Sequence, residues 1–372
     1  MKRIAVASHV TLVDGKQYDG VGNVLIATLS SICKEFIFVR HSLDGLLGSE
    51  VHKYRFSKIA NVEKLKVIRK VSALRYLSEV ISTVYYFSNR ESIDIYVGVD
   101  PLNGLAGIFL KKLHKIDTAI FLTSDYSENR FGNKLMSRVY RLIDNYCVRN
   151  ADEIWSVSSK IVGIRKSMGL SDVKNIFLPN VPPVEYNSFR NNKHDKYNLI
   201  TYGIIDKQLD FEGTIRAVAS LATKYPKISF TIVGNGPEEA RLKSLSKKLG
   251  VYDRVYFKGR QSLKDTLELA SRSGIGLALY TGVWGFNQFG DSTKCREYFN
   301  YGLPVLSTDT HSTVDDIKES GAGIITDLSV ESYVTAIEKI IENYDSYSNK
   351  SLMLGHKYEG VHRREFLRLL NS

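Results

Sequence analysis

A segment at residues 290–309, GDSTKCREYFNYGLPVLSTD, has the residue types and spacing needed to bind an anion. Ser292 is a good N-cap, and a glycine and a proline mark the end of the helix that this pattern predicts. A helix N-terminus presents unpaired N–H groups and a partial positive charge. A diphosphate could therefore bind at Ser292 and Thr293, with Lys294 supplying a full charge.

The same predicted helix carries Glu297 before it ends at Tyr301. Five residues separate Glu297 from Ser292, which is roughly 7 Å along the axis at about 1.5 Å per residue. This separation is close to that between the diphosphate and the ribose hydroxyls of one nucleotide, so one helix could hold both groups. The alternative is an amphipathic core helix on which Glu297 is only solvated.

These residues resemble a segment of the GT-B glycosyltransferases, especially family 4, in which a small residue, Lys, two residues, Glu and Tyr precede Gly-x-Pro-Val. The resemblance implies that Glu297 contacts the ribose of a nucleotide-sugar donor and that the helix start contacts its diphosphate. Many family members carry a Glu-x7-Glu pair, but this chain has Phe289 at the first of these positions. Asp291 is the acid that could compensate.

The length of 372 residues predicts two domains, because one hydrophobic core rarely grows so large. The longest apolar runs are strand-sized and fall short of the roughly 18 residues that cross a bilayer. The first residues indicate a strand and not a signal peptide, so we expect a cytoplasmic protein. Three widely spaced cysteines without a Cys-x-x-Cys pair predict reduced thiols.

The net charge of +11 is unevenly distributed, since residues 1–190 hold 27 Lys and Arg against 18 Asp and Glu. This excess of +9 indicates an anionic partner at the N-terminal half: a membrane surface, a lipid-linked phosphate or a nucleic acid. Residues 61–87 place basic side chains, Arg75 among them, between apolar ones at near-helical spacing. They predict a basic amphipathic helix, either a solvated outer helix or an interfacial one at a membrane.

Strand-like and helical runs alternate through both halves of the chain, which is βαβ order. Residues 179–197 hold three of the seven prolines and little apolar periodicity, so a domain boundary is expected there. The fold class is therefore α/β, with doubly wound Rossmann-like domains at 1–185 and 186–350 and a cleft between them. The GT-B resemblance implies that the first domain binds the acceptor, that the second binds the nucleotide sugar, and that a final helix at 351–372 packs back on the first.

Three strand-end segments of the second domain supply further donor-site candidates. They are Gly203 with Lys207, Gly234 with Gly236, and Phe257 with Gly259. The resemblance assigns Lys207 to the diphosphate and the region of Phe257 and Gly259 to the base, although Lys207 could equally be a surface lysine. Glycines at strand ends let a ligand or another backbone approach closely.

In the first domain, LTSDYSENRF predicts a strand that delivers Asp125 to its carboxyl end, with Arg130 nearby. An acid there could act in general acid–base chemistry, and Arg130 could orient it or bind the acceptor. Asp125 could instead only cap its loop, and Asp100 at a comparable strand end is the competing catalytic candidate. His9, near another strand end, could line the acceptor site or could simply pack.

Gly20 and Gly22 precede a predicted helix in the segment YDGVGNVLIA. They resemble the glycine-rich first loop of GT-B enzymes, which implies a place near the donor phosphates. A tight structural turn explains the same glycines, because such turns are common in α/β domains.

These features predict a cytoplasmic glycosyltransferase at the inner face of the membrane, moving a sugar from a nucleotide-diphosphate sugar to a hydroxyl of a glycan acceptor, with a lipid-linked surface polysaccharide as product. No cofactor beyond this co-substrate is expected, and no metal, because the chain lacks an Asp-x-Asp ligand pair. A sugar-nucleotide epimerase of the same fold is the alternative. A non-catalytic membrane-binding or nucleic-acid-binding protein is a third reading, but a nucleic-acid partner is not expected without an aromatic-interleaved basic motif.

Overall fold

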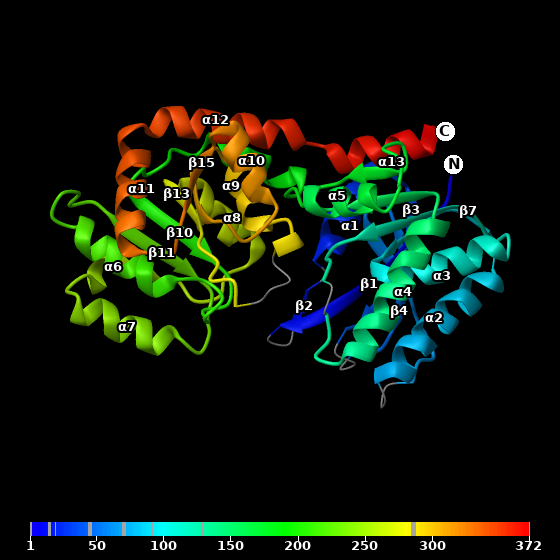
Figure 1. The fold of residues 1–372 in the computed structure, drawn as a ribbon. Coiled ribbons are helices and arrows are strands. Elements are labelled where there is room, and N and C mark those ends of the chain that lie inside the picture. The colour runs from blue at the N-terminus through cyan, green and yellow to red at the C-terminus, as the bar shows by residue number, and fades with distance from the viewer. Residues whose placement is uncertain are drawn as a thin grey trace. The chain divides into compact units, whose positions relative to one another are not determined.

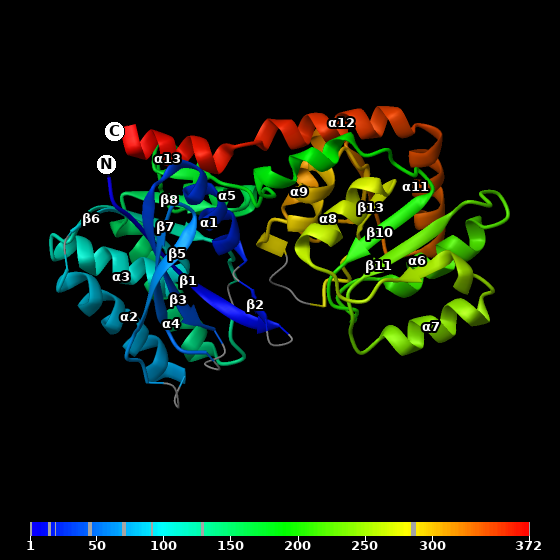
Figure 2. The same ribbon diagram turned by 180° about the vertical axis from the view of Figure 1, so that it is seen from behind.

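The computed structural model describes residues 2–13, 16–18, 20–43, 47–68, 72–90, 92–127, 130–283 and 288–371. The chain divides into two compact units, one made of Met1–Pro179 with Gly360–Ser372 and the other of Asn180–Glu359. Each unit contains a twisted sheet with helices on both faces (Figures 1 and 2). The predicted α/β fold class with two Rossmann-like domains is confirmed.

The first unit is built around a sheet in the order β5-β4-β3-β1-β6-β7-β8-β9, with β2 paired to β1. Its strands are β1 (Ile4–Val13), β2 (Lys16–Tyr18), β3 (Glu35–Ser42), β4 (Glu50–Arg55), β5 (Lys58–Lys64), β6 (Ile93–Val99), β7 (Ile116–Thr123), β8 (Glu153–Ser156) and β9 (Asn175–Phe177). Its helices are α1 (Val21–Ile32), α2 (Ser72–Ser88), α3 (Asp100–Lys112), α4 (Lys134–Asn150), α5 (Ser159–Ser167) and α13 (Val361–Asn371). Along this order the strands β3, β1, β6, β7, β8 and β9 are parallel to one another. At the β3 edge, β4 and β5 extend the sheet as an antiparallel hairpin.

Apolar residues of the central strands point to both faces of this sheet, as expected for buried parallel strands. Leu25 of α1 and Phe366 of α13 pack on one face. Phe87 of α2 and Leu110 of α3 pack on the other, and α4 packs beside α3. The sheet therefore holds its strand ends rigidly between two helical layers.

The second unit has a fully parallel sheet in the order β12-β11-β10-β13-β14-β15. Its strands are β10 (Asn198–Tyr202), β11 (Ser229–Val233), β12 (Val255–Phe257), β13 (Ile275–Ala278), β14 (Val305–Thr308) and β15 (Gly323–Thr326). Its helices are α6 (Phe211–Leu221), α7 (Glu239–Lys248), α8 (Leu263–Arg272), α9 (Thr293–Asn300), α10 (Thr313–Ser320), α11 (Val330–Glu342) and α12 (Tyr344–Tyr358), with 3-10 turns η1 (Val184–Asn191) and η2 (Tyr252–Arg254). This is the 3-2-1-4-5-6 order of a dinucleotide-binding sheet, whose order reverses between β10 and β13.

The prediction of one helix over residues 61–87 is wrong in its first part. Residues 58–64 form β5, which pairs with β4, and among the described residues of this stretch the helix α2 begins at Ser72. Phe56 and Ser57 both have positive φ, which is the geometry of a two-residue hairpin turn. Arg75 is buried on α2 instead of facing outward, and Arg69 and Lys70 lie outside the described residues.

The three cysteines are buried free thiols. In the parts of the chain described above, no helix is both long and apolar enough to cross a membrane.

Candidate functional site

The start of α9 lies near the point where the strand order of the second sheet reverses, between β10 and β13. Ser292 caps the helix, since its Oγ accepts a hydrogen bond from the Cys295 N–H at 3.4 Å. The Ser292 N–H donates to Thr313 Oγ1 at 2.8 Å. The N–H groups of Thr293 and Lys294 have no acceptor among the described residues, so the helix keeps two amides for an anion.

Lys294 lies beside the carboxyl ends of both strands at the reversal point. Its Nζ donates to Tyr280 Oη at 3.2 Å and lies 5.0 Å from the centre of that ring, just after β13. A Cβ placed on Gly203, just after β10, would lie 3.6 Å from Lys294 Nζ. Burial works against the charge of Lys294, but Tyr280 and Glu297 outweigh it and raise the pKa of the ammonium group. Lys294 is thus a positioned cation next to the free amides.

Glu297 lies one turn into α9 and is 5% exposed. Its Oε2 accepts a hydrogen bond from Tyr202 Oη at 2.5 Å, and Oε1 has no partner among the described residues. Burial raises the pKa of Glu297 to about 7, although the Tyr202 hydrogen bond and the charge of Lys294 oppose the shift. The side chain is neither fully bonded nor turned into bulk water.

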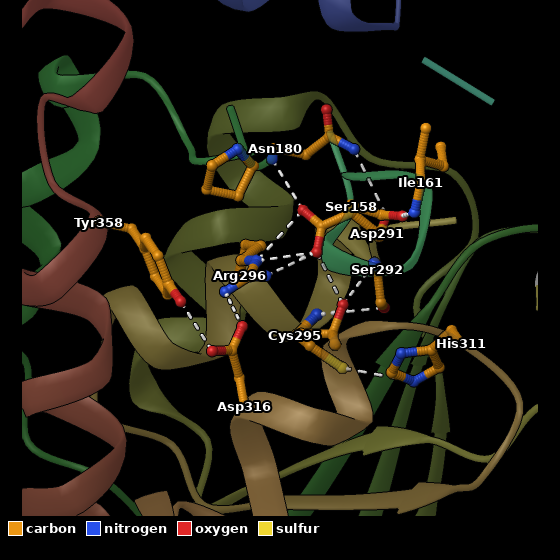
Figure 3. A network of polar contacts seen from close by, with 12 residues as sticks. Ser158, Ile161, Asn180, Asp291, Ser292, Cys295, Arg296, His311, Asp316 and Tyr358 are labelled. Atoms are coloured by element: carbon orange, nitrogen blue, oxygen red, sulfur yellow. Dashed lines mark hydrogen bonds and ion pairs between the residues drawn. The ribbon is translucent and has the colours of Figure 1, made fainter. Parts of the chain in front are cut away.

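Asp291 makes a structural network, as Figure 3 shows. Its carboxylate accepts from Arg296 Nε at 2.9 Å, from Thr313 Oγ1 at 2.8 Å and from the Asn180 N–H at 2.7 Å. Arg296 also contacts Asp316 at 2.8 Å. Protein donors therefore bond both oxygens, and Asp291 anchors the start of α9. Its role in place of the missing Glu stays a prediction.

The glycines at the strand ends bring backbone segments together. A Cβ on Gly234, which has φ of +138°, would lie 1.9 Å from the Gly203 carbonyl oxygen. A Cβ on Gly236 would lie 2.4 Å from the Ile205 carbonyl oxygen. The Gly234 N–H donates to the Gly259 carbonyl at 2.8 Å. These contacts explain the glycines without a ligand and show that three strand ends form one surface.

Lys207 and Phe257 lie on this side of the unit, and no hydrogen bond or ion pair among the described residues joins their side chains to α9. Lys207 is exposed and, with Asp206, Asp210 and Arg241, lines a pocket of about 450 Å³ at the start of α6. Phe257 ends β12 with the Lys243 ammonium 5.3 Å from its ring centre. Their assignments to diphosphate and base remain predictions.

In the first unit, Asp100 and Asp125 follow the neighbouring parallel strands β6 and β7. Asp100 Oδ1 accepts from Ser124 Oγ at 2.7 Å, and Asp100 has φ of +66°, which is strained for a residue with a side chain. Asp125 Oδ2 accepts from Arg130 at 2.8 Å. Burial raises the pKa of Asp125, the Arg130 charge opposes this, and the Asp100 charge adds to it. The structure thus brings these predicted residues together, with Tyr140 of α4 stacked against the Arg130 guanidinium at 5.1 Å.

His9 lies in a buried polar cluster. Its Nδ1 faces Asn103 Nδ2 at 3.1 Å and its Nε2 faces Glu79 at 3.2 Å. Because the Asn103 Nδ2 group can only donate, His9 Nδ1 accepts from it and His9 Nε2–H donates to Glu79. With both ring nitrogens occupied, the observed geometry favours the packing role over contact with an acceptor.

Gly20 and Gly22 lie at the N-terminus of α1. Gly20 has φ of +52°, and a Cβ there would meet no atom within 4 Å, so its role is conformational. Gly22 is buried within the first turn of the helix. The two glycines thus open a second helix N-terminus.

Sequence reasoning missed Tyr202 and Tyr280, which hold Glu297 and Lys294 in place. Each follows an apolar run at a strand end, in LITY and GLALY. A tyrosine at the carboxyl end of a predicted strand was the available signal. The carboxyl ends of adjacent parallel strands meet at one edge of a sheet, where open α/β folds bind their ligands.

The Glycosyl transferases group 1 family matches residues 185–351. A sequence search of curated proteins gives no match. Three similar solved structures each align with nearly the whole chain. Alr3699/HepE of Anabaena in complex with UDP has a TM-score of 0.68 at 13% identity over 100% of both chains. WaaG, a glycosyltransferase involved in lipopolysaccharide biosynthesis, has a TM-score of 0.59 at 16% identity over 96% of this chain and 95% of that chain. A UDP-N-acetylglucosamine 2-epimerase has a TM-score of 0.61 at 13% identity over 98% and 94%.

The likeness to solved structures shows the fold, which transferases and an epimerase share, and the family match over residues 185–351 supports a glycosyltransferase. Residues 185–351 form a Glycosyl transferases group 1 domain, and the protein is a glycosyltransferase of GT-B fold.

Proposed function

We propose that the enzyme transfers a hexose from a nucleoside-diphosphate hexose to a hydroxyl of a lipid-linked glycan during surface polysaccharide synthesis. The observation that carries the proposal is the start of α9, where two free amides and Lys294 lie one turn from Glu297. A diphosphate needs positive charge and N–H donors, and a ribose needs an acceptor of two hydroxyl hydrogens. One rigid helix supplies both.

A uridine nucleotide is the first donor to test. The HepE structures hold UDP, UDP with glucose, or UDP-glucose, and their fold covers this whole chain. The strand end at Gly259 supports a place for the base, because a Cβ on this glycine would meet no atom within 4 Å.

We assign catalysis to the carboxylates of the first unit. Asp125 is the proposed general base for the acceptor hydroxyl, because burial holds its pKa above the ordinary range and nearer to neutral pH. Arg130 holds one oxygen of Asp125 and is the proposed acceptor contact. Asp100 keeps Ser124 in place between the two strand ends, which makes it the second candidate.

No divalent cation enters this proposal. The charge of the leaving diphosphate is met by Lys294 and the α9 amides, which need no metal to bind an anion. Transfer that persists in excess chelator supports this assignment, whereas loss in chelator with recovery on adding Mg²⁺ contradicts it.

The proposed acceptor places the enzyme at the cytoplasmic face of a membrane, where a lipid carrier presents the glycan. The charge of +9 on residues 1–190 supports contact with an anionic surface at that half. WaaG acts in lipopolysaccharide biosynthesis, a pathway with a lipid-anchored product. The fold similarity is compatible with such an acceptor.

A thermal-shift screen of UDP, GDP, ADP and CMP sugars tests the donor, because a ligand that binds only the folded protein raises its unfolding temperature. One nucleoside diphosphate sugar should stabilise the protein, and the matching nucleoside alone should not. Product analysis of that donor without acceptor tests the reaction class. Epimerised sugar nucleotide would contradict the proposed transfer.

A further inference from the structure

The outer face of α4 exposes large apolar side chains in a helical stripe. Leu135 is 70% exposed, Val139 is 47% exposed and Leu142 is 61% exposed. Their spacing of i, i+4 and i+7 places them on one face. Burying such side chains away from water is favourable, so this stripe is suited to a partner with an apolar interior.

Basic side chains flank the apolar stripe on α4. The four exposed ones are Lys134, Arg138, Arg141 and Arg149. None of the four has a carboxylate partner among the described residues. The only acid of the helix, Asp144, is buried and bonded by both terminal nitrogens of Arg165 at 2.6 Å. The exposed face of α4 is therefore apolar and cationic, and no acid of the described residues pairs with its four cations.

A groove of about 560 Å³ adjoins this face between α4 and α5. Its charged lining residues are Arg141, Arg149 and Lys174, and none of its lining residues is acidic. The rest of the wall is mostly apolar and includes Val148 and Ile164, with Asn145 as an uncharged polar residue. The groove has the size and charge for a phosphate with a short apolar attachment.

The groove also adjoins the proposed acceptor centre. Tyr126, the residue after Asp125, lines it. On the other side of the same loop, Arg130 bonds Asp125 and stacks on Tyr140 of α4. A helix held against a bilayer by its outer face would keep this loop near the carrier lipid.

We propose that α4 docks the enzyme on an anionic phospholipid bilayer, with its apolar stripe at the boundary of headgroups and acyl chains and its basic flank and groove on lipid phosphates. This inference rests on the proposed lipid-linked acceptor and names the surface that reaches it. Amphipathic helices with an apolar face and Lys or Arg beside it bind membranes in this way.

The exposed stripe of α2 is the natural comparison. It consists of Leu74, Leu77, Ile81 and Tyr85, which are all at least 48% exposed. Arg75 of the same helix is buried, lies 3.8 Å from Glu79 and cannot reach a headgroup from there. Arg75 is the one basic residue within α2, whereas α4 carries four exposed ones. The exposed Lys66 lies beside α2, since its carbonyl accepts from Ser82, so α2 is the competing surface that the test must separate from α4.

The test measures binding of the full-length enzyme to sedimenting vesicles of phosphatidylcholine, with and without phosphatidylglycerol. Substitution R138Q/R141Q/R149Q should reduce partitioning onto the anionic vesicles on the order of 100-fold, at about fivefold for each cation. L135S/L142S should reduce it at least tenfold, and high salt should weaken only the cationic contribution. The matched control K227Q/K247Q/K248Q, on exposed lysines of the second unit, should bind as the unchanged enzyme does.

Equal partitioning of the unchanged enzyme onto neutral and anionic vesicles would overturn the proposal. So would retention by the α4 variants with loss by an L77S/I81S variant of α2, which would assign docking to the other helix. Donor-induced thermal stabilisation is measured on every variant, both to verify folding and to separate the two ideas. Lost vesicle binding by folded α4 variants supports this inference, whereas absence of any donor response in the unchanged enzyme refutes the proposed function alone.

Discussion

Replacing Glu297 by Ala removes the carboxylate proposed to hold the ribose. A hydrogen bond to a charged group contributes about 1.5 to 3 kcal/mol, so kcat/KM for the donor should fall by one to two orders of magnitude at pH 8. The buried Tyr202 hydroxyl also loses its acceptor in this variant. Glu297→Gln keeps an acceptor for Tyr202 and should lose only the contribution of the charge.

The raised pKa of Glu297 makes this deficit depend on pH. With a pKa of about 7 in the free enzyme, about a tenth of the carboxyl is ionised at pH 6 and about nine tenths at pH 8. The kcat/KM of the unchanged enzyme should therefore rise across this range. The Gln variant has no charge to gain, so its deficit should be largest at pH 8 and small at pH 6.

The same group makes a signed contribution to stability. Its pKa in the folded state, about 7, lies above the ordinary value of 4.5, so the neutral form is favoured by folding. The resulting stabilisation, about 3 kcal/mol, is present below pH 4.5 and is lost as the pH rises through 7. Urea unfolding of the ligand-free enzyme should show this loss, and Glu297→Gln should not.

The assay is donor-saturation kinetics at pH 6, 7 and 8, with Glu331→Gln on the exposed start of α11 as the matched control. A Gln variant whose donor kinetics equal those of the control at pH 8 would refute the proposed contact between Glu297 and the ribose. A deficit that is the same at every pH would refute the assigned ionisation while leaving the contact itself in place.

Three further outcomes are expected. Lys294→Met should raise the donor KM at least tenfold, because a positioned cation next to two free amides is lost. An effect of the same size on binding of the nucleoside alone would contradict a contact between Lys294 and the diphosphate. Gly234→Ala should lower the free energy of urea unfolding by about 3 kcal/mol or more. The new Cβ would meet the Gly203 carbonyl oxygen at 1.9 Å, and a φ of +138° is unfavourable for alanine. An unchanged urea midpoint would show that the turn can relax. Asp125→Asn should lower kcat by about 10²-fold or more with little change in donor KM. If Asp125→Asn stays active and Asp100→Asn loses this much activity, Asp100 is the general base instead.

The features that sequence predicted well are those with local signals. Three signals within about a dozen residues mark the two ends of α9: the cap at Ser292, the positive φ of Gly302 and the proline that follows. The observed bounds of α9 agree with the predicted ones to within one residue. The alternation of strands and helices likewise determined the fold class. Such signals require no knowledge of distant contacts.

The features that sequence missed depend on partners far along the chain. The β4–β5 hairpin turns at Phe56 and Ser57, which are not typical residues for positive φ, so the pattern that follows was read as a helix. Asp291 has no local sign that Thr313 and Asp316 complete its network with Arg296. Pairings of this kind arise only when the sheet is assembled.

The central claim, that α9 binds the nucleoside diphosphate of the donor, is tested most directly by a crystal structure of the enzyme with UDP, or with whichever nucleotide the thermal-shift screen selects. We predict diphosphate oxygens within hydrogen-bond distance of the Thr293 and Lys294 amides, with a ribose hydroxyl on Glu297. A nucleotide bound elsewhere, or one whose ribose leaves Glu297 bonded to Tyr202 alone, would contradict the account.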